Sequence, residues 1–284
     1  MNVILVDTSY TTFHRFFATL RWLSFAKKEI YKEHKDDNTF DWFSIKEFSD
    51  TYKKMYLKAI IDLVTPSVYK DSIVIFCMDA PQDTLWRHEL SSQCYKGNRV
   101  DLTEKNNYRP TFAYTYDTLI PELKKNNKNI HSMLVPKMEA DDLIALATRY
   151  IRYKRPNHTI YLVSGDNDFL QLGYDNLYIA DYKKKELIHM TPEEAKEALR
   201  QKIVSGDCSD NIPSIFPPDI KINNKVKKAV RENKDDMKQF LKDYPEARKL
   251  YNNNKKMISF KYIPKHFRKP VYKMVKKIVK KIDK

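Results

Sequence analysis

Three short apolar runs in this chain each end on an aspartate, although they lie far apart in the sequence. They are Asn2–Asp7, Ser72–Asp79 and Thr159–Asp166. Each combines β-branched, aromatic and aliphatic residues over a short span, which predicts a buried β-strand. Asn176–Asp181 has the same character, and Ser132–Pro136 is a weaker strand candidate. The chain is therefore expected to place several aspartates at the carboxyl ends of its strands.

Helical patterns alternate with these strands. Apolar residues recur at helical spacing over Ser44–Val64, Ala140–Tyr153 and Thr191–Val204, and the third segment opens with the Thr-Pro-x-Glu pattern of a capped helix. Residues 273–284 predict a basic amphipathic helix at the end of the chain. Strands that alternate with helices predict an α/β fold with a mostly parallel central sheet flanked by helices.

Two segments depart from this alternation. Residues 91–130 are polar, rich in Tyr, Asn and Lys, and only weakly periodic. A long irregular insertion in a compact domain is usually functional or disordered. After Asp207 the composition shifts toward Lys and Asn with short helical pieces. We therefore expect one domain over residues 1–190 and a basic helical lobe over residues 191–284.

The charge of the chain is concentrated at one end. The formal net charge is +15, and residues 221–284 hold 22 Lys and Arg against 6 Asp and Glu. This balance points to a polyanionic partner, with nucleic acid ahead of an anionic membrane. No apolar run approaches the roughly 18 residues of a membrane span. The three cysteines are widely spaced, which favours a reducing intracellular compartment over a disulfide framework or a zinc site.

Carboxylates gather where the predicted elements end. Ligands of an open parallel sheet bind beyond the carboxyl ends of its strands, so acids from distant segments are expected to meet there. The full set is Asp7, Asp79, Glu139, Asp141, Asp142, Asp166, Asp168, Asp207 and Asp210. Like charges packed together raise one another's pKa unless a cation neutralises them. A ligand set made only of oxygens suits Mg²⁺, with Mn²⁺ as a substitute.

Each acidic motif also has an ordinary structural explanation. A single aspartate after a strand is usually a turn or N-cap residue, which is the preferred interpretation for Asp175 and Asp181. Acids in the first turn of a helix interact favourably with its macrodipole. Recurrence of the motifs in this strand order favours a metal site. Glu139 and Asp141 cannot point the same way in an ideal helix, so Glu139 is expected to reach in from the N-cap.

An acidic, metal-binding edge beside a basic lobe indicates phosphodiester chemistry. Divalent ions bridge carboxylates to a phosphate, and in two-metal sites, with ions roughly 3.5–4 Å apart, one activates water while the other stabilises the leaving oxygen. The pattern therefore predicts a nuclease. The alternative is an inactive nucleic-acid-binding module, but such a binder gains nothing from nine carboxylates near a phosphate backbone.

Five segments resemble, in order, the motifs of the 5′ nuclease / flap endonuclease superfamily. They are residues 5–9, 76–99, 138–145, 163–172 and 203–215. Residues 251–264 are also similar to the T-even phage ribonuclease H branch of this family. The resemblance implies a PIN-like α/β domain with a helical arch near 91–130. It also implies a helix–three-turn–helix element near 200–232 that grips duplex DNA.

The resemblance assigns roles to the acids and to two neighbouring bases. The first metal ion would be held or oriented by Asp7, Asp79, Glu139 and Asp141. The second would be served, in part through water, by Asp142, Asp166, Asp168, Asp207 and Asp210. Lys96 and Arg99 match the basic pair at the base of the arch, and Lys96 would face the scissile phosphate. Asp141 and Asp168 join these two as the expected catalytic residues.

The resemblance also implies contacts to nucleic acid. Tyr95 would stack on a base, and Arg87 would contact phosphate or pair with a carboxylate. The loop after Asp210 has prolines where the family usually carries a Gly-x-Gly hairpin. Because proline lacks an N–H donor, duplex binding would depend more on a set of lysines. These are Lys221, Lys225, Lys227 and Lys228.

The implied function is a divalent-metal-dependent, structure-specific 5′ nuclease, acting as 5′-3′ exonuclease and flap endonuclease. Its expected substrates are 5′ flaps, nicked duplex DNA and RNA–DNA primer hybrids in replication, and its product carries a 5′-phosphate. Replication proteins such as a single-strand-binding protein or a sliding clamp are expected partners of a monomer that acts in the cytoplasm or at a site of phage replication, away from membranes. The alternative is a PIN-type endoribonuclease, which performs the same chemistry on RNA.

Overall fold

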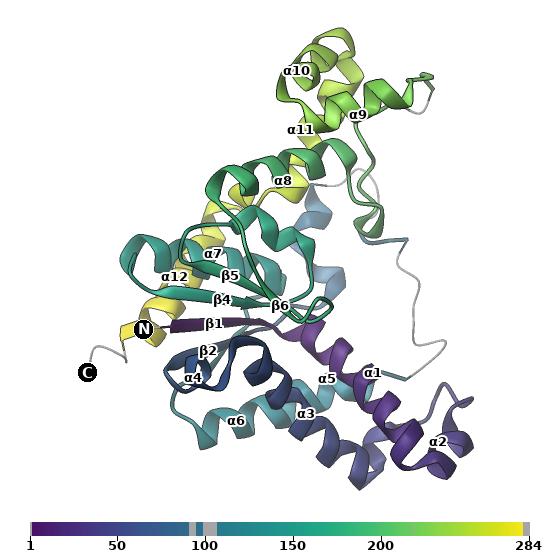
Figure 1. The fold of residues 1–284 in the computed structure, drawn as a ribbon, viewed down its shortest axis with the longest axis vertical. Coiled ribbons are helices and arrows are strands. Elements are labelled where there is room, and N and C mark those ends of the chain that lie inside the picture. Colours follow the sequence, from purple (N-terminus) through teal and green to yellow (C-terminus); the bar gives the residue numbers. More distant parts are fainter. Residues whose placement is uncertain (1, 91–94, 99–106, 218, 281–284) are drawn as a thin grey trace.

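A six-stranded sheet lies at the centre of the protein, with helices on both of its faces (Figure 1). The computed structural model describes residues 2–90, 95–98, 107–217 and 219–280. The strands are β1 Asn2–Asp7, β2 Ser72–Cys77, β3 Ile130–Met133, β4 Thr159–Val163, β5 Leu177–Asp181 and β6 Glu186–His189. Their order is β3-β2-β1-β4-β5-β6, and all pair in parallel except β5 with β6. The predicted α/β fold with a mostly parallel sheet is confirmed.

The central strand β1 explains why the strands read as continuous apolar runs. It pairs with β2 on one side and β4 on the other, so both of its faces are covered. Successive side chains of a strand point to opposite faces. Val3 and Leu5 therefore pack on one face, while Ile4 and Val6 pack on the other. The polar ends of these strands are left at the edge of the sheet.

Twelve α-helices lie within the described residues. They are α1 Thr8–Ala26, α2 Lys28–His34, α3 Lys46–Val64, α4 Pro66–Lys70, α5 Arg109–Ala113, α6 Ile120–Asn126, α7 Ala140–Lys154, α8 Pro192–Ser205, α9 Asn224–Glu232, α10 Lys234–Asp243, α11 Pro245–Ile258 and α12 Lys265–Lys280. Helices α3, α7 and α8 lie within two residues of their predicted bounds. The predicted cap of α8 is confirmed, because the Glu194 amide donates to Thr191 Oγ1 at 3.2 Å and the Thr191 amide donates to Glu194 Oε2 at 2.8 Å.

Helix α1 was not predicted from the sequence, although it follows β1 directly. Its buried stripe contains Thr8, Thr11, Thr12 and Thr19 among only a few large apolar residues. A search for apolar residues at helical spacing therefore finds too little signal there. The helix covers one face of the sheet domain together with α3, as Figure 1 shows.

The segment 91–130 is more regular than its composition indicates. Residues 109–126 are helical, comprising α5, a π-helical stretch and α6. Thr115 is buried in this stretch, and its hydroxyl lies 2.7 Å from the Tyr52 hydroxyl of α3. The expectation of an irregular insertion is wrong for this part, because its polar residues make buried hydrogen bonds. Positions 91–94 and 99–106 of the expected arch lie outside the described residues.

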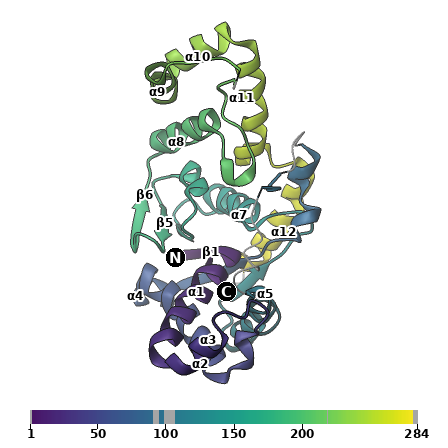
Figure 2. The same cartoon turned by 90° about the vertical axis from the view of Figure 1, so that its right-hand side faces the viewer.

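Helices α8 to α11 form a lobe at one end of the molecule (Figure 1). The lobe has its own core around Phe216, Val230 and Phe240. Helix α12 leaves the lobe and lies beside α7 in both views (Figures 1 and 2). The lobe that the sequence predicted over 191–284 therefore does not include α12. None of the helices in the described part of the chain combines the length and apolarity that crossing a membrane requires.

Helix α12 is expected to stabilise the sheet domain through its apolar stripe. Val275 is fully buried against the core that contains α7, whereas Lys273 is exposed. We predict that Val275→Asp lowers the free energy of unfolding by roughly 3 kcal/mol or more, because it buries a charge without a partner. Lys273→Asp should change it by less than about 0.5 kcal/mol. Urea unfolding followed by circular dichroism measures both, and equal effects would show that α12 is not part of the core.

Candidate active site

A cavity of about 710 Å³ lies at the carboxyl edge of the sheet. Five of the predicted acids line it together, although they come from separate segments of the chain: Asp7, Asp79, Glu139, Asp141 and Asp166. Asp7 ends β1, and Asp79 and Asp166 closely follow β2 and β4. The expected convergence of acids at the ends of neighbouring parallel strands is therefore present in the structure.

Short polar contacts hold these acids in place. Asp7 accepts hydrogen bonds from the Tyr10 amide at 3.0 Å and from the Ser164 hydroxyl at 2.9 Å. Asp79 Oδ1 accepts from the Ala140 amide at 2.7 Å, which joins the end of β2 to the first turn of α7. Backbone amides in the first turns of α1 and α7, together with the Ser164 hydroxyl, thus fix these acids.

The pKa values of these acids show that they are buried and that they repel one another. Burial, and then the neighbouring Asp79, raise the pKa of Asp7 to about 7. Burial also raises the pKa of Asp79, and the pKa of Asp141 is raised well above its ordinary value by burial and by the charges of Asp7 and Asp166. Buried oxygens that resist ionisation fit a hard divalent cation, which would supply the missing positive charge.

The side chains of these acids do not yet surround a common metal position. Within the described residues, no group of three or more His, Cys, Asp or Glu side chains is arranged to hold a metal ion. Three basic side chains, Arg87, Lys96 and Lys202, lie among the acids and pair with some of them. The donor set has the right chemistry for Mg²⁺, but several of its members are engaged by protein cations.

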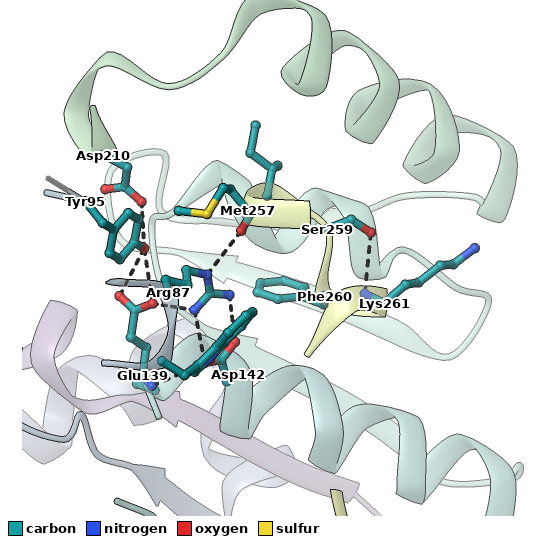
Figure 3. A network of polar contacts seen from close by, with 12 residues as sticks. Arg87, Tyr95, Glu139, Asp142, Asp210, Met257, Ser259, Phe260 and Lys261 are labelled. Atoms are coloured by element: carbon teal, nitrogen blue, oxygen red, sulfur yellow. Dashed lines mark hydrogen bonds and ion pairs between the residues drawn. The ribbon is translucent and has the colours of Figure 1, made fainter. Parts of the chain in front are cut away.

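Arg87 forms the most buried of these pairs. Its guanidinium donates to Asp142 Oδ1 at 2.7 Å and to the Met257 carbonyl at 3.1 Å, and it also pairs with Glu139 (Figure 3). Trp86 Nε1 donates to Asp142 Oδ2 at 2.7 Å. Arg87 is 4 % exposed and Asp142 is fully buried.

This network corrects two of the sequence-based assignments. Arg87 was expected to contact nucleic acid or to pair with a carboxylate. The structure shows the second alternative, because its guanidinium donates to the buried carboxylates of Glu139 and Asp142. Asp142 was expected to serve the second metal, but its oxygens face Arg87 and Trp86. Adjacent helical residues point about 100° apart, so Asp142 turns away from the cavity that Asp141 faces.

Glu139 pairs both with Arg87 of the buried network and with Lys96 at the cavity. It is the N-cap residue of α7, as the sequence predicted. Burial would raise its pKa, but the charges of Arg87 and Lys96 outweigh this and lower its pKa to about 2. Lys96, which has a left-handed φ of 58°, pairs with Glu139 and lines the 710 Å³ cavity. The expected place of Lys96 at the acidic edge is thus observed.

Tyr95 is not placed to stack on a base. Its side chain packs in the core beside Leu85 and Ile203, and the residue is 3 % exposed. Its hydroxyl lies 3.1 Å from an oxygen of Glu139 and 3.1 Å from Asp210 Oδ2 (Figure 3). The stacking assignment is therefore corrected, and Tyr95 positions two carboxylates instead. Arg99, the other half of the expected basic pair, lies outside the described residues.

The remaining acids lie on a narrow recess beside the main cavity. Asp168, Asp207 and Asp210 line this recess, which shares Glu139 and Asp141 with the main cavity. Lys202 of α8 pairs with Asp168 and lies 2.9 Å from Asp207 Oδ2. Sequence reasoning missed Lys202, because a lysine in the last turn of a helix is an ordinary partner of the helix macrodipole.

Sequence reasoning also missed the aromatic and basic part of the cavity lining. This wall consists of Tyr10, Phe13, Tyr108, Arg109 and Phe112. They come from α1 and from residues 108–112, within the expected arch. Aromatic faces of this kind provide stacking surfaces for bases, and a guanidinium attracts phosphate.

The expected duplex-binding lysines lie on the lobe, away from the cavity lining. Lys221, Lys225 and Lys228 are exposed, and Lys227 lies over the ring of Phe216 at 5.7 Å from its centroid. Three of the four belong to α9 (Figure 1). Their exposure is compatible with phosphate contacts, and their role stays a prediction.

Comparison with known proteins gives a family and a set of similar folds. Residues 2–200 match the model of a family described as 5′-3′ exonuclease, N-terminal resolvase-like domain. A bacteriophage T5 protein co-crystallised with metal ions is similar, with TM-score 0.65 and 17% identity over 98% of this chain and 99% of that chain. The zinc-bound T5 5′-exonuclease is similar with TM-score 0.63 and 15% identity, covering 98% and 99%.

A third similar structure is a bacteriophage T5 flap endonuclease in complex with DNA and metal ions. Its TM-score is 0.60 at 16% identity, over 99% of this chain and 100% of that chain. At these identities the matches show the fold alone. The comparison with curated protein sequences gives no match.

The raised pKa values predict how metal binding depends on pH. Because Asp7 has a pKa near 7 when folded and 3.8 ordinarily, acidification stabilises this part of the metal-free protein over that interval. On acidification, protons replace the divalent cation at these carboxylates. Ca²⁺ should therefore raise the melting temperature at about pH 7.5 and lose most of this effect near pH 5. The difference between melting temperatures without Ca²⁺ and at one fixed Ca²⁺ concentration removes the opposite contribution of His14, whose pKa burial lowers to about 4. An equal Ca²⁺ effect at both pH values would contradict the account.

The buried Arg87 network predicts a second outcome. Arg87→Met should lower the free energy of unfolding by about 3–5 kcal/mol, because it leaves Asp142 buried without a counter-charge and Glu139 with Lys96 alone. Adding Asp142→Asn to this variant should recover part of the loss, since one buried charge is then removed. Urea unfolding measures both variants. A loss below about 1 kcal/mol for Arg87→Met would show that the network is not structural.

Proposed function

The chain belongs to the 5′-3′ exonuclease family, and we propose that it is a divalent-metal-dependent, structure-specific 5′ nuclease that hydrolyses phosphodiesters of 5′ flaps, nicked DNA and RNA–DNA primers. One observation carries the proposal. The buried carboxylates of Asp7, Asp79, Asp141 and Asp166 share a cavity, and burial together with neighbouring acids raises their pKa values. Such an edge is stable at neutral pH with divalent cations bound.

The carboxylates divide into two groups that suit two Mg²⁺ ions. Asp7, Asp79 and Asp141 would hold the first ion, with Asp166 between the two positions. Asp168, Asp207 and Asp210 would serve the second. When bound, such ions polarise the phosphodiester, activate water and stabilise the leaving oxygen. Mn²⁺, which also prefers oxygen ligands, would substitute.

Lys96 is the basic group that we expect to act on the phosphate. Its ammonium lies between Glu139 and the ring of Tyr95, with Nζ 5.1 Å from the ring centroid, so its position is restricted on two sides. A phosphate in the cavity would meet this ammonium, which stabilises the charge that develops as the bond breaks. Arg99 would contribute similarly from the adjoining segment. The family resemblance implies that hydrolysis leaves the phosphate on the 5′ end.

The two sides of the cavity suggest how DNA would lie. A 5′ single strand would pass the aromatic wall that includes Phe13, Tyr108 and Phe112, where its bases would stack. The duplex would lie on the lobe and contact the lysines of α9 through its phosphates. The T5 flap endonuclease structure with DNA and metal ions supports this class of substrate. We further propose that the protein acts as a monomer inside the cell, where single-strand-binding protein or a sliding clamp would bring it to its substrate.

Substitution of single carboxylates tests the proposal. Asp141→Asn and Asp168→Asn should each lower cleavage of a 5′ flap by at least about 100-fold. Each substitution weakens the binding of a divalent cation that stabilises the transition state of hydrolysis. Binding of the flap in Ca²⁺, followed by fluorescence anisotropy, should remain measurable. Asp175→Asn, at an exposed acid outside both groups, is the matched control and should cleave as the unchanged protein does.

The substrate comparison separates the proposal from its rivals. A PIN-type endoribonuclease would cleave only single-stranded RNA among a DNA flap, an RNA–DNA hybrid and that RNA. An inactive binding module would cleave none of them and bind no Mg²⁺. Turnover of both Asn variants at the rate of the control would also reject the assignment of these acids.

A further inference from the structure

We propose that Lys202 is an internal counter-ion that occupies the place of the second divalent cation, so that metal can bind Asp168 and Asp207 only by displacing the lysine. This inference rests on the proposed function and concerns the order in which the same site fills. It assigns a positioning role to a residue that neither the family motifs nor the sequence pattern singled out.

The ammonium of Lys202 bridges acids from two different elements. It pairs with Asp168 of the 3₁₀ helix Asn167–Leu172, and its Nζ lies 2.9 Å from Asp207 Oδ2. The Lys202 side chain is 22% exposed, and those of Asp168 and Asp207 are each 17% exposed. A single cation between two largely shielded carboxylates is the arrangement that a bound metal ion would create.

The backbone holds the partners in place, so the contact is not the chance reach of a surface lysine. The Gly206 amide donates to the Lys202 carbonyl at 2.8 Å and ends α8 there. Gly206 has φ +71°, and a Cβ at this position would lie 2.4 Å from the Pro213 carbonyl oxygen, so only glycine fits the turn. Asp207 then exchanges two backbone hydrogen bonds of 2.8 Å with Ile212.

Asp168 is fixed from the other side. Its amide donates to Asp166 Oδ1 at 2.8 Å, at the start of the 3₁₀ helix that packs against α8. The two carboxylates therefore face each other across a gap set by α8 and this 3₁₀ helix. Without a cation in the gap, their charges would repel.

The two halves of the acidic edge differ in their neutralisation. Among the described residues, no Lys or Arg side chain forms an ion pair with Asp7, Asp79 or Asp141. Asp168 and Asp207, in contrast, are both paired with the ammonium of Lys202. The first divalent ion thus meets uncompensated charge, whereas the second must compete with an ammonium that is already bound. Filling is expected to be sequential, with the second ion the weaker.

Calorimetric titration with Ca²⁺ on the full chain tests this order. The unchanged protein should bind one ion tightly and a second more weakly. In Lys202→Met the second ion should bind about tenfold tighter or more, since a positive charge within a few ångströms has been removed, while the first is little changed. Lys196→Met is the matched control, because Lys196 lies on the same helix, is exposed and pairs with Glu193 at 3.4 Å. A folded Lys202→Met protein whose second ion binds equally or more weakly would overturn the proposal.

A measurement on the unchanged protein does not depend on how the variant folds. Acetic anhydride acetylates free lysine amines, and digestion with mass spectrometry gives the rate at each lysine. Ca²⁺ at concentrations that fill both positions should speed acetylation of Lys202 several-fold and leave that of Lys196 unchanged. An unresponsive Lys202 in a protein that binds two ions would reject this inference alone. A protein that binds no divalent ion would reject the proposed function itself.

Discussion

The burial of several carboxylates at one edge of a parallel sheet is the constraint on which the rest of this structure depends. Parallel strands bring their carboxyl ends to the same edge, so acids that close β1 and follow β2 and β4 meet there. Ionised groups in such a place need hydrogen bonds and opposite charge. Asp7 illustrates the residual imbalance, since two hydrogen bonds leave its pKa at about 7.

The charges of these acids are neutralised in three different ways. Arg87 permanently neutralises the inner acids Glu139 and Asp142, and this pairing ties the start of α7 to the end of α11 through Met257. Lys96 lies at the boundary, where it faces both Glu139 and the cavity. We propose that Asp7, Asp79 and Asp141 bind divalent cations from solution. In this proposal, pairing with Arg87 separates the structural acids from those that would hold a metal ion.

Much of this arrangement could be predicted because it depends on local chemistry. Strand ends, the capping of α8 and the N-cap position of Glu139 follow from residue type and spacing. What could not be predicted depends on direction and long-range packing. Asp142 adjoins Asp141 in sequence but points toward Arg87, and Tyr95 lies in a motif yet is buried. The buried face of helix α1 consists largely of threonines, so a search for apolar residues at helical spacing does not find it. Helix α12 packs against α7, which lies far away in the sequence.

The central claim is that this acidic edge, loaded with divalent cations, cuts DNA beside a free 5′ end. The most direct measurement is product mapping on a 5′-labelled flap substrate, with Mg²⁺ and with EDTA in its place. The account predicts cleavage near the junction of single and double strand, with a 5′-phosphate on the downstream product and no cleavage in EDTA. Undiminished cleavage in EDTA, or no cleavage of any 5′-ended DNA in Mg²⁺, would contradict it.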